Sequence, residues 1–239
     1  MKHTAVSPPA PRTWWTPAGR TVVFLLAATS IACLLAEFYH IGTMRAWVCW
    51  VLLPACAALG VLALADWRRN DRRLARMIAL GALSGLLAAV AYDVFRVPFV
   101  WAREWHLAGL LPPLALFKVF PRFGAMILGQ ALEAPAYSAA AHALGWTYHF
   151  SNGATFGIMY LAVIGDAARR SWAWAVLMAA GLEIGMLLTP YPQVFGIHLA
   201  APFIAVTLTA HILFGTTLGL LARRWAVRWK PRHSRNLPG

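Results

Sequence analysis

The first candidates for chemistry in this 239-residue chain are ionisable side chains within long apolar stretches. Asp93 and Arg96 lie three residues apart and therefore share one face of a helix. That face continues a row of small residues, Gly81, Gly85 and Ala89, on which another helix can pack. Because an unpaired charge in hydrocarbon costs several kcal/mol, we expect Asp93 and Arg96 to be buried and paired. Such a pair either ties helices together or anchors a substrate.

A second polar group opens a later apolar stretch, in the segment 148–153, which reads YHFSNG. His149 and Asn152 lie on one face of a helix, with Tyr148 beside them. This spacing predicts that His149 and Asn152 can bind one ligand.

Two more ionisable residues lie within the last two apolar stretches. Glu183 precedes Pro190 by seven residues, which places it about 10 Å below the end of its segment by helical rise. We expect Glu183 to face a cavity or to be held protonated by burial. His211 shares a helical face with two later glycines and is expected in the interior, while His198 lies in the preceding loop.

Together these residues form a candidate site in the outer half of the protein. The expected catalytic residues are His149, Glu183, His211 and Asp93, and the expected substrate-binding residues are Arg96, Asn152, Tyr148 and His198. Histidine and carboxylate also ligate catalytic zinc. If a divalent metal such as zinc binds, we expect His149, His198 and His211 as its ligands, although no His-Glu-x-x-His or His-x3-His motif occurs. A haem between His198 and His211 is not expected, because Pro202 interrupts a continuous helix between them.

The elements that position these residues must lie in a membrane. Hydrophobic residues make up 60% of the chain and charged residues only 12%, too few to cover a soluble protein of this size. The apolar residues fall in blocks of about 20, the length that crosses a bilayer as a helix. The net charge of +13 comes from arginines at the ends of these blocks, so we do not expect a nucleic-acid partner. The three cysteines fit neither a disulfide framework nor a metal site.

We therefore expect an all-α integral membrane protein, one domain over residues 1–239, with six transmembrane helices. Their expected positions are residues 21–39, 46–65, 77–100, 146–165, 172–190 and 201–222. Basic tails, 1–20 and 223–239, flank this bundle. The first helix is expected to stay uncleaved, because no small-x-small site follows it.

The distribution of basic residues predicts the orientation. Of 21 Lys and Arg residues, all but five lie in the segments that this topology places in the cytoplasm. The five exceptions are Arg45, Arg96, Arg103, Lys118 and Arg122. By the positive-inside rule, both termini face the cytoplasm and the protein lies in the cell inner membrane as a multi-pass protein.

The segment 101–145 is interrupted by Pro112, Pro113, Pro121 and Pro135, and no piece of it is long enough to span. We expect re-entrant or interfacial helices on the outer face, a candidate lid over the site.

Packing of the bundle is expected to depend on glycines. Pairs with the spacing Gly-x3-Gly are Gly81 and Gly85, Gly153 and Gly157, Gly181 and Gly185, and Gly215 and Gly219. They predict that the third to sixth helices form the core, with the fourth and sixth in close approach. By helical rise, His149 would then lie about 10 Å nearer the outer surface than His211, which favours a water- or substrate-filled cavity over a metal cluster.

These features leave several functions open. The leading hypothesis is a membrane-embedded enzyme that acts on a lipid or lipid-linked substrate. The alternatives are a transporter of a small solute or of protons, and an accessory or assembly subunit without catalysis. Membrane lipids are the expected partners, and a protein partner or a homo-oligomer is possible.

Overall fold

The computed structural model describes residues 13–69 and 72–229, which are helical and contain no strand. In chain order the elements are α1 (Pro17–Phe38), α2 (Met44–Trp47), a π-helical turn η1 (Val48–Leu52), α3 (Leu53–Trp67), α4 (Arg73–Val100), a 3₁₀ turn η2 (Leu116–Lys118), α5 (Val119–Leu128), α6 (Ala139–Ile164), a 3₁₀ turn η3 (Ala167–Arg169), α7 (Ala173–Leu187), α8 (Tyr191–Val194) and α9 (Ala201–Arg228). The outermost parts of the two expected tails, 1–12 and 230–239, lie outside these residues.

Within the described ranges, four helices are long and apolar enough to cross a membrane. They are α1, the continuous 24-residue helix Met44–Trp67, α4 and α9. Large apolar side chains point outward from the bundle, including Leu25, Val61, Val163 and Leu177. The chain therefore has the helices and the apolar surface of a multi-pass membrane protein.

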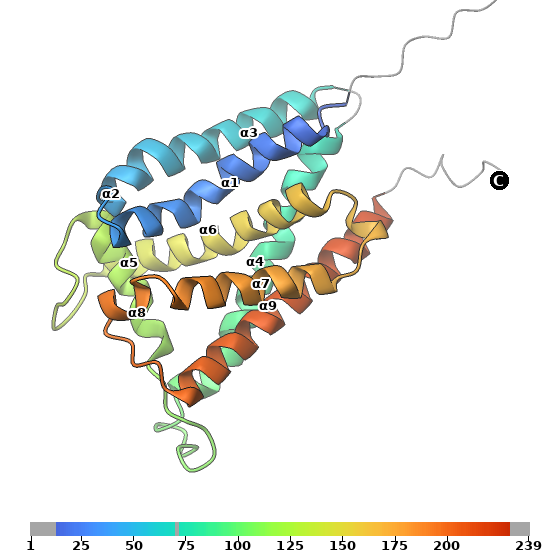
Figure 1. The fold of residues 1–239 in the computed structure, drawn as a ribbon. Coiled ribbons are helices and arrows are strands. Elements are labelled where there is room, and N and C mark those ends of the chain that lie inside the picture. The colour runs from blue at the N-terminus through green and yellow to red at the C-terminus, as the bar shows by residue number, and fades with distance from the viewer. Residues whose placement is uncertain (1–12, 70–71, 230–239) are drawn as a thin grey trace, which may run out of the picture.

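The long helices lie side by side, and α6 lies near the centre of the bundle (Figure 1). α4 packs against both α6 and α9, while α6 also packs against α1 and α5. The start of α1 and the end of α9 lie at one end of the bundle, and α5 and α8 lie at the other (Figure 1).

Glycines allow α4 and α6 to cross with their backbones in contact. A methyl group at Gly85 would lie 2.1 Å from the carbonyl oxygen of Gly153, and one at Gly157 would lie 2.0 Å from the oxygen of Gly81. No side chain fits there, so these four glycines set the distance between the two helices.

The other two glycine pairs depart from the expected packing. A methyl group at Gly215 would lie 2.6 Å from the oxygen of Ala175, so the α9 glycines approach α7 rather than α6. Nothing in the described chain lies within 4 Å of a methyl group at Gly181 or Gly185. The expected packing of the fourth helix on the sixth through these glycines is therefore wrong. On α7 the reason is rotation: Glu183 takes the inward face, and residues two positions away lie about 200° around the helix.

The segment 101–145 is less helical than its neighbours. Turns follow α4, α5 is a ten-residue helix, and a loop leads to α6. α6 begins at Ala139 with Ser138 as its N-cap, seven residues before the expected start, because Pro135 precedes the helix and does not interrupt it. A second glycine contact holds α5 on the first turns of α6: a methyl group at Gly145 would lie 1.7 Å from the oxygen of Phe120.

Candidate functional site

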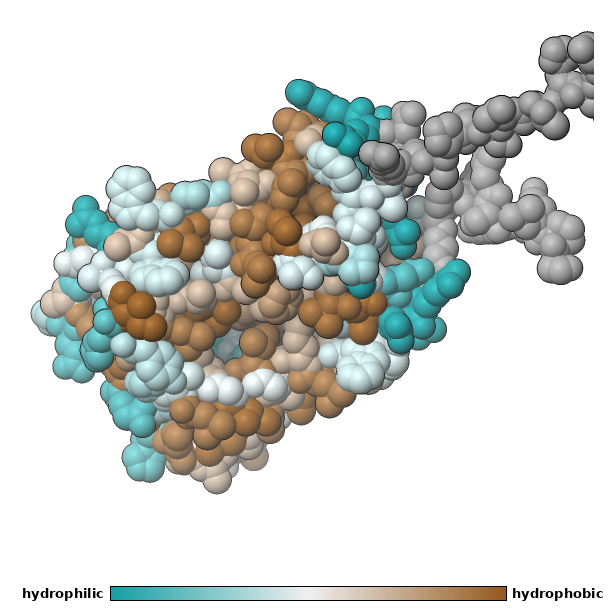
Figure 2. Space-filling view, turned by 45° about the horizontal axis from the view of Figure 1, so that its top comes forward, coloured by the Kyte–Doolittle hydropathy of each residue, from teal (hydrophilic) through white to brown (hydrophobic). Residues whose placement is uncertain are grey.

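A cavity of about 160 Å³ lies where α1, α4, α6, α7 and α9 converge beneath α5 and α8. Most of its lining is apolar, and Figure 2 shows a hollow in the apolar face of the molecule with hydrophilic surface at its floor. The polar members of the lining are Tyr92, Arg96, His149, Asn152, Glu183, Tyr191, Thr207 and His211.

On one side of the cavity, α4 and α6 form a buried charged cluster. Arg96 Nη1 lies 3.2 Å from Asp93 Oδ1, and His149 Nε2 lies 2.8 Å from Asp93 Oδ2. Asp93 and Arg96 are 7% and 3% exposed, so the predicted buried pair is present. Asp93 itself does not line the cavity, and its two oxygens instead hold Arg96 and His149 in place. Asp93 is therefore a positioning residue.

Arg96 is fixed by neighbours from α4, η2 and α5. Its Nη2 donates to the carbonyl oxygen of Leu116 at 2.7 Å. Its guanidinium carbon lies 4.6 Å from the ring centre of Tyr92, 5.1 Å from that of Phe117 and 5.4 Å from that of Phe120. These rings attract the cation and exclude water from it.

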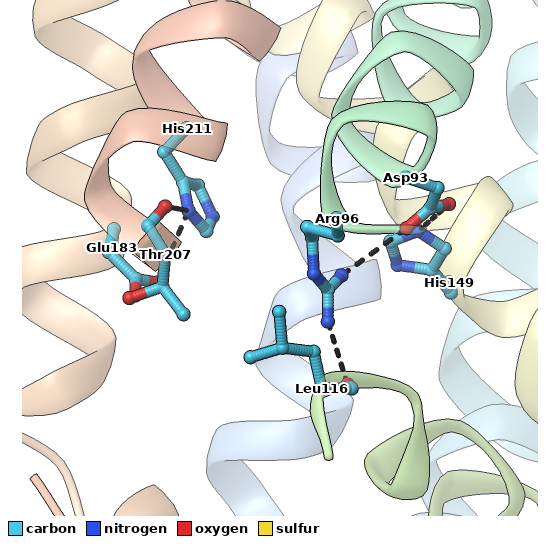
Figure 3. Close-up of polar contacts among 7 residues, drawn as sticks. All are labelled: Asp93, Arg96, Leu116, His149, Glu183, Thr207 and His211. Atoms are coloured by element: carbon cyan, nitrogen blue, oxygen red, sulfur yellow. Dashed lines mark hydrogen bonds and ion pairs between the residues drawn. The ribbon is translucent and has the colours of Figure 1, made fainter. Parts of the chain in front are cut away.

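On the other side, α7 and α9 supply a second imidazole–carboxylate pair. His211 Nδ1 lies 2.9 Å from the carbonyl oxygen of Thr207 and 3.4 Å from Glu183 Oε2. Glu183 is 7% exposed. Figure 3 shows Arg96 between this pair and the pair formed by Asp93 and His149.

The hydrogen bonds indicate which ring nitrogens are free. A carbonyl oxygen only accepts, so Nδ1 of His211 carries the proton that it donates to Thr207, and Nε2 of the neutral ring is left as an acceptor. A carboxylate oxygen likewise only accepts, so with a carboxylate at Asp93 it is Nε2 of His149 that donates, and Nδ1 is left free. Both imidazoles thus border the cavity with one basic nitrogen that has no hydrogen-bonding partner in the described chain.

The two histidines lie at matching positions along their helices. His149 and His211 are each ten residues beyond the first residue of their helix. The 10 Å offset expected from the sequence rested on a later start of α6, and it disappears when helical rise is counted from the helix starts that the structure shows. Tyr92 lies close to both, with ring centres 5.9 Å from His149 and 4.9 Å from His211.

Three expected site residues lie elsewhere or have other partners. Tyr148 is outside the cavity lining and donates to the carbonyl oxygen of Ser30 at 2.6 Å, which ties α6 to α1. Asn152 lines the cavity, but its side-chain oxygen accepts from the Ser30 hydroxyl at 2.5 Å. His198 is exposed in the loop before α9 and does not line the cavity.

Among the lining residues that the sequence did not identify are Tyr92, Phe120 and Tyr191. The position of Tyr92 directly before Asp93, and four residues before Arg96, is a signal that was available. Phe120 and Tyr191 reach the site only because α5 and α8 fold over one end of it.

No group of three or more His, Cys, Asp and Glu side chains within residues 13–69 and 72–229 is arranged to hold a metal ion. In particular, His198 lies apart from His149 and His211. The described site thus presents two separate imidazole–carboxylate pairs and one arginine, a set suited to proton transfer and to binding a negatively charged group.

Comparisons with protein families, with curated proteins and with solved structures gave no match to this chain.

Proposed function

We propose that the chain crosses the inner membrane six times, with both termini in the cytoplasm. The crossings beyond the four apolar helices are α6 and α7. α6 has 26 residues, about 39 Å by helical rise, and packs its polar face against α1 and α4. α7 has 15 residues, about 22 Å, which a locally thinner bilayer accommodates.

The orientation is supported by the charges and aromatic residues at the two ends. The start of α1 and the ends of α3 and α9 lie at one end of the bundle (Figure 1). The arginines at or after the ends of α3 and α9 and in the turn after α6 are Arg68, Arg69, Arg169, Arg170, Arg223 and Arg224. The loop after α4, toward the other end, exposes Trp101, Trp105 and Leu110, side chains that favour a membrane interface.

Cysteine labelling tests this orientation. In a variant without native cysteines, Leu110→Cys should react with a membrane-impermeant maleimide added outside intact cells, and Arg170→Cys should react only after lysis. The reverse pattern would overturn the topology.

We further propose that the protein is a membrane-embedded enzyme that carries out acid–base chemistry on the headgroup of a lipid or lipid-linked substrate. One observation carries this proposal: two imidazole–carboxylate pairs border one mostly apolar cavity, and each leaves a ring nitrogen without a hydrogen-bonding partner among the described residues. Acid–base catalysis by histidine uses such a free ring nitrogen, which accepts a proton from the reacting group or from water, and the imidazolium so formed then donates that proton to the leaving group.

The roles follow from the contacts. Asp93 orients His149 and stabilises its imidazolium form when the ring accepts a proton at Nδ1. Glu183 and the Thr207 carbonyl do the same for His211, whose Nε2 exchanges the proton. Arg96 stabilises negative charge that develops on the substrate between them.

The test is conversion of lipid by purified protein. Reconstituted into vesicles made from a total polar lipid extract, the wild-type protein should consume one lipid class and form a product, followed by mass spectrometry. His149→Asn and His211→Asn should each slow the conversion by about 10²- to 10⁴-fold. Proton or solute flux across sealed vesicles without any change in lipid masses would instead support the transporter hypothesis and overturn the enzyme.

A further inference from the structure

Arg96 has an unsatisfied donor at the cavity wall. Its Nε is buried and has no hydrogen-bond acceptor in the described part of the chain, although Nη1 and Nη2 are both bonded. The side chain is only 4% exposed, and a buried donor without an acceptor is costly. A ligand oxygen reaching Arg96 from the cavity would remove part of that cost.

The guanidinium is also held in a fixed orientation. Asp93 and the Leu116 carbonyl bind its two terminal nitrogens, while Tyr92 and Phe120 cover its surface. A rigid planar cation of this kind suits the paired oxygens of a phosphate or carboxylate.

The outer end of the cavity is closed by aromatic side chains from three elements. Phe38 of α1 lies 5.7 Å from Phe195 and 5.9 Å from Tyr191 between ring centres, and Phe123 of α5 lies 5.4 Å from Phe195. Arg122 donates to the Phe195 carbonyl at 2.6 Å and fixes this cover. A ligand therefore does not enter through this end.

The side of the cavity is more open. α7 packs on α9 but only slightly on α6, and the hollow in Figure 2 interrupts the apolar face. The walls that α1 and α7 contribute include Ile31, Leu34, Leu182 and Met186, all apolar. An alkyl chain fits such walls, and a hydrated ion does not.

The volume limits what the cavity holds. At about 160 Å³ it is close to engineered cavities of about 150 Å³ that bind a benzene ring. It therefore accepts a small headgroup and the first carbons of a chain, and the rest of the chain must lie in the bilayer.

We propose that the cavity binds an amphiphile whose anionic oxygen headgroup, a phosphate or carboxylate, contacts Arg96 while its alkyl chain passes to the bilayer between α7 and the wall formed by α1 and α6. This inference names the substrate class of the proposed enzyme and rests on that proposed function. The amphiphile enters sideways from the membrane. Its headgroup is brought beside the free nitrogens of His149 and His211.

Binding to the full-length protein in detergent micelles or nanodiscs tests the inference. The probes are hexadecyl phosphate, hexadecanoate, hexadecanol and inorganic phosphate. We expect the two anionic amphiphiles to bind about 10- to 100-fold more tightly than hexadecanol, the difference that a hydrogen bond to a charged group supplies. Inorganic phosphate should bind poorly because it lacks the chain. Equal affinity for hexadecanol and the anionic probes would overturn the inference.

Two variants locate the binding. Arg96→Lys keeps the charge beside Asp93 but loses the planar fork, so it should remove most of the preference for the anionic probes. Leu182→Trp should block the side opening and weaken every long-chain probe, while the control Leu177→Trp on the lipid-facing side of α7 should not. Unchanged binding in Leu182→Trp would rule out the side entrance.

Binding and turnover separate the two proposals. Tight, Arg96-dependent binding without any lipid conversion would uphold this inference and overturn the enzyme. Conversion of an uncharged lipid would uphold the enzyme and overturn this inference.

Discussion

The crossing of α4 on α6 and the outer face of α7 both carry glycines four residues apart, yet only the crossing is a helix contact in the described structure. At the crossing, each glycine faces backbone of the other helix. On α7, Gly181 and Gly185 face outward because Glu183 occupies the inward face. The same spacing therefore packs one pair of helices closely, whereas on α7 it leaves the glycine face without a helix partner in the described chain.

The polar contacts on the two sides of the cavity also differ, and those beside the tight crossing are shorter. Beside the tight crossing, Asp93 makes contacts of 2.8 Å and 3.2 Å with His149 and Arg96. Beside α7, Glu183 is 3.4 Å from His211. We therefore regard the α4–α6 side as a fixed wall and the α7 side as the wall that adapts to a ligand.

The largest expected effect on stability comes from removing the Asp93 carboxylate of the fixed wall. Asp93→Ala leaves the buried Arg96 charge without its partner and should lower the free energy of unfolding by about 3–5 kcal/mol. Glu183→Ala should cost less, about 1–3 kcal/mol, because His211 still donates to Thr207. Thermal unfolding in detergent measures both.

The double variant Asp93→Ala/Arg96→Ala is the control for this pair. Because it removes both charges, it should be more stable than Asp93→Ala alone. A larger loss in Glu183→Ala than in Asp93→Ala would show that we have assigned the fixed wall to the wrong side.

The next effect compares the glycines themselves. Gly157→Ala places a methyl group against the Gly81 backbone and should cost about 1–3 kcal/mol, or more if the helices cannot separate. Gly185→Ala meets nothing in the described chain and should change stability by no more than about 1 kcal/mol, in the stabilising direction expected from helix propensity.

Unfolding curves of the two alanine variants, measured in the same detergent, decide this comparison. If Gly185→Ala lowered the free energy of unfolding as much as Gly157→Ala, the outer face of α7 would have to be covered by another molecule, such as a second copy of the chain.

The sequence predicted what helical periodicity determines. The spacing of Asp93 and Arg96 gave their pairing, and Glu183 and His211 were correctly expected in the interior. Periodicity shows which face of a helix a residue occupies, but not which helix faces it. The contact of His149 with Asp93 joins residues 56 positions apart and depends on the α4–α6 crossing.

The sequence-based predictions that differ from the structure also depend on contacts between elements, which periodicity does not show. The early start of α6 follows from the Ser138 cap and from the contact of α5 with Gly145, neither of which appears as an apolar repeat. The sequence predicts a ligand-binding role for Tyr148, because it is polar and lies next to His149. In the structure it lies one position around the helix from His149 and faces α1.

The smallest expected effect is that of Tyr148→Phe, which tests whether Tyr148 only ties α6 to α1 or also binds the ligand. Tyr148→Phe removes the hydroxyl that donates to Ser30 and should lower the free energy of unfolding by about 0.5–1.5 kcal/mol. Because Tyr148 does not line the cavity, affinity for hexadecyl phosphate should stay within about twofold of wild type. Asn152→Ala removes the other contact with Ser30 and also changes the lining, so it should alter both quantities. A strong loss of probe binding in Tyr148→Phe, at unchanged stability, would return Tyr148 to the binding site and show that the wall formed by α1 and α6 also moves.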